Sequence, residues 1–63
     1  MSEKIVIAVD AMGGENSPSK IIDGIKLVLK DNSDLYFNLF GKSDQINDLI
    51  RGNDLLNEKC KII

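Results

Sequence analysis

The sequence predicts an α/β fold in β-α-β-α-β order, with parallel strands joined by right-handed helical crossovers. Two observations lead to this class. Strand-like runs alternate with amphipathic segments along the whole chain, and the first run, residues 4–9, is apolar and β-branched on both faces. Such alternation is typical of parallel sheets, and a strand that is apolar on both sides belongs in a sheet covered by helices.

The first strand leads into a turn and then a helix. Residues 10–17 form the turn, Ser17 is suited to cap the helix, and Pro18 is suited to its first position. We expect the helix to span 18–30, with a core-facing stripe of apolar residues at helical spacing. The stripe consists of Ile21, Ile22, Ile25, Val28 and Leu29.

The second half of the chain repeats the alternation with shorter elements. A strand is expected over 35–40, and Ser43 is suited to cap a helix over 44–51 that Gly52 ends. The apolar residues of this helix are Ile46, Leu49 and Ile50. Residues 53–58 are ambiguous, with one short helical turn as the expectation, and a third strand begins after them. Because natural domains rarely end partway into a core strand, we expect residues 1–63 to be the amino-terminal part of a single α/β domain whose remainder is absent.

Composition places this chain among ordinary globular proteins. Its 63 residues carry a net charge of -2, with 43% hydrophobic and 29% charged residues, and they form no basic patch, so no nucleic-acid partner is expected. Cys60 is the single cysteine and there is no histidine, which leaves neither an internal disulfide nor a metal site and favours a reducing, cytoplasmic location. The longest apolar run, residues 5–9, is too short for a signal peptide or a membrane span.

The turn after the first strand is the candidate functional site. In open α/β sheets, ligands bind beyond the carboxyl ends of the strands, and this turn lies at that end. Gly13 and Gly14 allow close backbone approach, and the helix that follows Ser17 presents free N–H groups that attract anions, phosphate above all. Asp10 adds a carboxylate that is suited to be a general base, a metal ligand or a phosphoryl-accepting nucleophile. The structural alternatives stay open: the glycine pair only makes a tight turn, and the aspartate only accepts hydrogen bonds from loop N–H groups.

Residues 5–14 carry a resemblance to a known family. The apolar strand followed by an Asp-Ala-Met-Gly-Gly run resembles the amino-terminal signature of the phosphate acyltransferase family, the fatty acid/phospholipid synthesis proteins. The motif residues are Asp10, Ala11, Met12, Gly13 and Gly14, with Glu15 where the family usually has aspartate. A second departure is Lys42, where the family more often has an acidic residue, and the family's chains are several times longer.

The resemblance implies a function, a fold and a set of partners. Family members transfer a fatty acyl group from acyl carrier protein to inorganic phosphate, and the acyl-phosphate feeds glycerol-3-phosphate acylation in phospholipid synthesis. The implied fold is a doubly wound, three-layer α/β/α sandwich of the isopropylmalate dehydrogenase type, in a cytoplasmic homodimer that meets the membrane through a glycerol-3-phosphate acyltransferase partner. No metal or organic cofactor is expected. On this sequence Asp10 is the catalytic candidate, and the phosphate-binding candidates are Gly13, Gly14 and Ser17.

Two other readings of the function remain as alternatives. The 63 residues alone are expected to be inactive, because pockets for acyl and carrier-protein ligands need walls that this chain does not contain. The chain would then be a truncated remnant, or an interaction module that pairs its sheet edge with another chain. A phosphotransfer domain with Asp10 as nucleophile or Mg²⁺ ligand is less favoured, since such domains commonly place a second carboxylate where this sequence has Met12.

Overall fold

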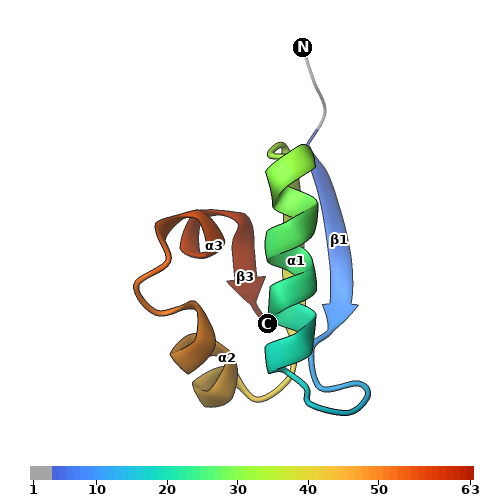
Figure 1. Cartoon of the computed structure of the whole chain (residues 1–63), viewed down its shortest axis with the longest axis vertical. Coiled ribbons are helices and arrows are strands. Elements are labelled where there is room, and N and C mark those ends of the chain that lie inside the picture. Colours follow the sequence, from blue (N-terminus) through green and yellow to red (C-terminus); the bar gives the residue numbers. More distant parts are fainter. Residues whose placement is uncertain (1–3) are drawn as a thin grey trace.

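The computed structural model describes residues 4–63 and has the predicted α/β order (Figure 1). In chain order the elements are β1 (Ile5–Asp10), α1 (Ser19–Asp31), β2 (Leu35–Phe40), α2 (Ser43–Ile50), α3 (Asp54–Lys59) and β3 (Cys60–Ile62). The strand predicted over 35–40 is confirmed residue for residue. The ambiguous segment before the third strand is a short helix, α3, because the side chain of Asn53 accepts a hydrogen bond from the backbone N–H of Leu56 and caps it.

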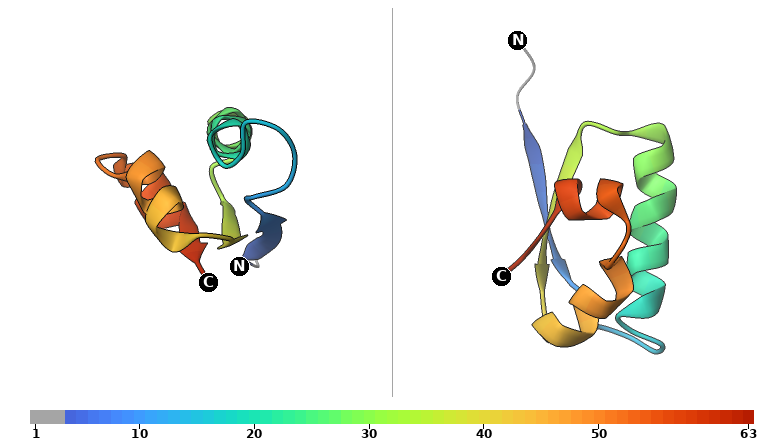
Figure 2. Two further views of the ribbon diagram at one scale, coloured as in Figure 1. Left: turned by 90° about the horizontal axis from the view of Figure 1, so that it is seen from below. Right: turned by 90° about the vertical axis from the view of Figure 1, so that its left-hand side faces the viewer.

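The three strands form one parallel sheet with β2 in the middle, in the order β1-β2-β3. The register pairs Ile7 with Phe37 and Phe37 with Cys60, so these residues face the same side of the sheet. Figure 2 places the three helices on one side of the sheet, and the burial of Phe37 and Cys60 identifies it as the side that these residues face. Within residues 4–63, the opposite face of the sheet is therefore not covered by a helix.

The core lies between the helices and the covered face of the sheet. Its buried residues are Ala11, Ile22, Ile25, Leu29, Phe37, Leu39, Ile46, Ile50, Leu56 and Cys60. The predicted helix stripe was too wide by one residue, since Val28 is 41% exposed, whereas Ile21 is partly buried and packs against the core. The buried residues of α1 are Ile22, Ile25 and Leu29, since one face of the helix packs against the core. Leu49 is likewise 37% exposed on the outer side of α2.

The prediction that both faces of the first strand are buried is wrong for residues 4–63. Ile5 is 53% exposed, Val6 is 47% exposed and Ile7 is 38% exposed. The physical reason is position: β1 is an edge strand that pairs only with β2, and the helices of this chain lie over one face alone.

Both predicted helix starts are shifted by one residue. Helix α1 begins at Ser19 with Pro18 as its N-cap, and α2 begins at Ser43 with Lys42 as its N-cap; neither N-cap residue makes a side-chain capping bond. The prediction that Ser17 caps α1 is wrong, because its hydroxyl instead donates to the carbonyl of Gly13 within the turn. Gly52, with φ of 79°, follows α2 as predicted.

Cys60 gives a test of the packing around β3. Burial raises the pKa of its thiol, so the neutral form is favoured in the folded chain. The folded thiol should react with a disulfide reagent at least about tenfold more slowly than the thiol of the urea-unfolded chain, because the thiolate is the reactive species. The stability that this burial supplies is fully present below the ordinary pKa of a thiol and is lost as the pH rises through the folded value. Equal rates in the folded and unfolded chains would contradict the packing; a Cys60→Ser variant gives the blank rate.

Candidate functional site

The candidate turn lies where two parallel strands end together. Asp10 pairs in register with Phe40, and the backbone N–H of Ala11 donates to the carbonyl of Phe40 at 2.9 Å. The turn that follows β1 and the turn that follows β2 therefore leave the sheet at the same edge (Figure 1). Both turns lie at the carboxyl ends of parallel strands, which is where ligands of open α/β folds bind.

Two apolar side chains anchor the turn to the core. Ala11 is fully buried, and Met12 is partly buried against the turn after β2. At Gly41 a Cβ atom would lie 2.6 Å from the Cγ atom of Met12 and 3.3 Å from the Cδ1 atom of Ile46. A side chain at position 41 would therefore displace Met12, which explains why glycine suits this position.

The carboxylate of Asp10 is exposed and holds the turn through one of its oxygens. Its Oδ1 atom accepts a hydrogen bond from the backbone N–H of Met12 at 3.0 Å, a local pattern typical of aspartate in turns. The other oxygen, Oδ2, lies 3.4 Å from the place where a Cβ atom at Gly13 would stand. The absence of a side chain at position 13 thus keeps the space beside Oδ2 open.

The rest of the turn uses left-handed backbone at two positions. Gly14 has φ of 85° and Asn16 has φ of 61°, a region that glycine adopts freely and asparagine tolerates. Asn16 was not singled out from the sequence, although its tolerance of this conformation was the available signal. Its carbonyl accepts from the backbone N–H of Lys20 at 3.0 Å, so it connects the turn to the start of α1.

The charges near this edge are not neutralised by ion pairs within residues 4–63. The ion pairs of this part of the chain join Lys26 to Asp23, Arg51 to Asp48 and Lys59 to Glu58. Asp10 and Glu15 are both exposed, and Lys42 is exposed at the start of α2. Asp10, Gly13, Gly14 and Ser17 lie together in this one turn, and the carboxylate of Asp10 is exposed to solvent.

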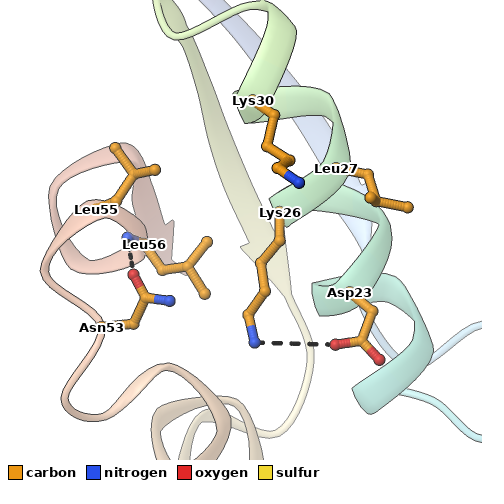
Figure 3. Close-up of a pocket in the computed structure, with 7 residues that line it drawn as sticks. All are labelled: Asp23, Lys26, Leu27, Lys30, Asn53, Leu55 and Leu56. Atoms are coloured by element: carbon orange, nitrogen blue, oxygen red, sulfur yellow. Dashed lines mark hydrogen bonds and ion pairs between the residues drawn. The ribbon is translucent and has the colours of Figure 1, made fainter.

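Two hollows of the described surface lie away from the turn. A groove of about 550 Å³ lies between α1 and the start of α3, with Leu27, Leu55 and Leu56 as its apolar lining (Figure 3). Its polar residues are Asp23, Lys26, Lys30 and Asn53, and the ion pair between Lys26 and Asp23 spans 3.9 Å. A second hollow of about 350 Å³ lies beside Tyr36 at the other end of the sheet. The candidate turn lines neither of these two hollows.

Two further observations describe the same part of the chain. Residues 4–63 bring no three His, Cys, Asp or Glu side chains together in a way that could hold a metal ion. None of the helices in the described range is long and apolar enough to cross a membrane.

Comparison with known proteins identifies the family. The sequence model of the family described as fatty acid synthesis protein matches residues 5–63. The chain belongs to this family. The match covers all the elements of the fold and includes the whole candidate turn. No solved structure matches this chain.

Relatives within the family are called phosphate acyltransferase. That of Rhodospirillum rubrum is 44% identical over 62 residues, which cover 98% of this chain and 18% of the relative. That of Pelagibacter ubique is 48% identical over 63 residues, which cover 100% of this chain and 18% of the relative. That of Limosilactobacillus reuteri is 47% identical over 51 residues. The chain therefore spans less than one fifth of the length of these relatives.

Proposed function

We propose that this chain supplies the phosphate-binding turn of an acyl-[acyl carrier protein]:phosphate acyltransferase. The observation that carries the proposal is the turn between β1 and α1, which holds an exposed carboxylate and two glycines at the carboxyl edge of the sheet. The relatives named phosphate acyltransferase supply the reaction class. The remaining walls of the site, and the activity itself, belong to the full-length protein of the family, of which the match covers 18% in these relatives.

The chemistry of the reaction matches what the turn offers. A phosphate oxygen attacks the carbonyl carbon of the acyl thioester, the carbon–sulfur bond breaks, and the carrier-protein thiolate leaves and receives the proton that the phosphate gives up. The backbone N–H groups at Gly14 and the start of α1 are suited to hold the phosphate or the oxyanion, whereas that of Gly13 already donates to the carbonyl of Asp10 at 3.4 Å. Asp10 is suited to take the phosphate proton during the attack, through the oxygen that Gly13 leaves open.

The proposal includes the partners that the family resemblance implies. Acyl carrier protein donates the acyl group, and the assembled enzyme is a cytoplasmic homodimer. Contact with the membrane runs through a glycerol-3-phosphate acyltransferase. These statements rest on the family resemblance, and they concern the full-length protein of the family.

A chimera tests the proposal. The matched segment of the Rhodospirillum rubrum relative is replaced by this chain, and acyl-phosphate formation is measured with acyl carrier protein thioester and varied phosphate. We expect activity within about tenfold of the relative, because this chain keeps the motif and the turn. A chimera that folds like the relative and forms no acyl-phosphate would contradict the proposed function.

A matched pair of glycine substitutions links the activity to the turn. In the chimera, Gly14→Ala is expected to raise the KM for phosphate by about tenfold or more, since φ of 85° is strained for any residue with a Cβ atom. Gly24→Ala is the control, because Gly24 lies in α1 with no atom near the position of an added Cβ. An unchanged KM for phosphate in the Gly14 variant would show that the backbone at Gly14 does not bind phosphate.

A further inference from the structure

The edge strand β1 has the composition of a central strand. Its residues Ile5, Val6 and Ile7 are consecutive, point alternately to the two faces of the sheet, and are each more than one third exposed. Strands that are apolar on both faces normally have helices over both faces and a strand on each side. Within residues 4–63, no element buries the side chains of Ile5, Val6 and Ile7.

The opposite edge of the sheet differs in a way that protects it. Strand β3 has only three residues, and its middle residue is the exposed Lys61. Short edge strands with lysine are a common defence against unwanted pairing. Strand β1 has six residues and no charge from Ile5 to Val9. The unprotected edge is therefore that of β1.

The uncovered face of the sheet continues this surface. Val6 and Ala8 lie on it beside the partly buried Tyr36 and Asn38, and Phe40, which is 43% exposed, lies at its carboxyl end. The ammonium groups of Lys4 and Lys59 lie 4.3 and 4.4 Å from the centre of the Tyr36 ring. These cations cover the amino-terminal end of the face. Lys61 lies on the same face beside Asn38, and Asp10 lies beside Phe40, so the exposed apolar side chains of the face are mainly those of Val6, Ala8 and Phe40.

We propose that the free edge of β1 and this face form a docking surface for the part of the family fold that follows the matched segment, and that a separate polypeptide can supply that part. The relatives carry more than four fifths of their length outside the match. The surface is already formed by residues 4–63, so docking needs complementary shape and a pairing strand but no peptide bond.

The strand order gives docking a consequence for the site. From β1 through β2 to β3 the sheet grows in one direction, so a strand added at the free edge of β1 reverses that direction beside β1. In open α/β sheets such a reversal opens a crevice at the carboxyl ends of the strands, and ligands bind there. Asp10, Gly13 and Gly14 follow β1 at that end. Docking would thus place a further strand and its loop next to the turn. This consequence for the site rests on the proposed function, whereas the docking surface itself does not.

Co-expression tests the docking. This chain is produced together with a tagged Rhodospirillum rubrum phosphate acyltransferase that lacks the 62 matched residues. We expect the shortened relative to become soluble and to retain this chain in one-to-one ratio on affinity purification. A shortened relative that stays insoluble, or that is purified without this chain, would overturn the proposal. So would self-association of this chain through β1 with no binding of the shortened relative.

Matched variants locate the surface. Val6→Lys places a charge on the uncovered face and is expected to lower the retained amount at least about tenfold, because docking would bury that charge. Leu27→Lys makes the same kind of change at a residue of α1 that is 65% exposed, and it should leave retention unchanged. Equal losses in the two variants would contradict the assignment to β1, and thermal melts of each variant verify that this chain stays folded.

An activity measurement on the purified complex separates the two proposals. A complex that forms but makes no acyl-phosphate supports the docking surface and counts against the proposed function. Absence of a complex, together with an active chimera, overturns the docking surface and leaves the proposed function supported.

Discussion

Replacing Leu39 with alanine is expected to leave most of this chain unfolded at room temperature. Leu39 lies in the middle strand, its side chain is fully buried, and its neighbours in register are Val9 and Ile62. Such a substitution costs about 2–5 kcal/mol, since it removes buried methyl groups and leaves a cavity. A core from a chain of this size rarely supplies more than about 3–5 kcal/mol, so the loss is comparable to the whole stability.

Thermal melts followed by circular dichroism measure this effect, with Leu27→Ala as the control. Leu27 is 65% exposed on α1, and surface changes of this kind usually stay within about 0.5 kcal/mol. For a small domain, 1 kcal/mol corresponds to about 4–8 °C in Tm. We expect the Leu39 variant to lose at least about 10 °C or its cooperative transition. A Tm equal to that of the unsubstituted chain would mean that β2 is not the centre of the core.

The elements with the clearest local pattern were the ones that the sequence predicted best. Strand β2 matches its predicted bounds because its apolar alternation is flanked by turn residues on both sides. The helix starts were displaced by one residue, because capping depends on which atoms a side chain meets. The hydroxyl of Ser17 is a capable cap by type, yet it donates within the turn to Gly13.

Properties that depend on distant partners were beyond local patterns. The order of strands is one, since parallel strands carry no local mark of their neighbours. The exposure of Val6 is another: its sequence context predicts burial, but no element within residues 4–63 covers its face of the sheet. The apolar residues on both faces of β1 thus predict a strand that is covered on both sides, and within residues 4–63 helices cover only one side.

The candidate turn was predictable because its parts are adjacent in sequence. Asp10, Gly13 and Gly14 lie within five positions of each other, so any compact turn brings them together. The contact between Met12 and Gly41 was not predictable, because it forms only when β1 and β2 pair in the observed register. This contact connects the turn to the second strand, and it makes the turn dependent on the sheet.

Replacing Asp10 in the chimera with asparagine should separate its two roles. Asparagine keeps an oxygen that can accept the 3.0 Å hydrogen bond from the backbone N–H of Met12, so the turn should keep its shape. It removes the negative charge and the capacity to take a proton. If Asp10 is the general base for phosphate, kcat should fall by about 10²–10⁴-fold while the melting temperature stays unchanged.

Asp10→Ala and Asp44→Asn complete the comparison. The alanine variant loses both the charge and the hydrogen bond, so it should lose the same activity and some stability as well. Asp44 is the matched control, since it is exposed and its Oδ1 atom accepts from the backbone N–H of Gln45 at 3.0 Å. Normal activity in the Asp10→Asn variant, with loss only in the alanine variant, would assign Asp10 to shaping the turn. If both Asp10 variants lose activity and the Asp44 variant keeps it, the negative charge of Asp10 takes part in the reaction, because the loss of that charge is what the two inactive variants share.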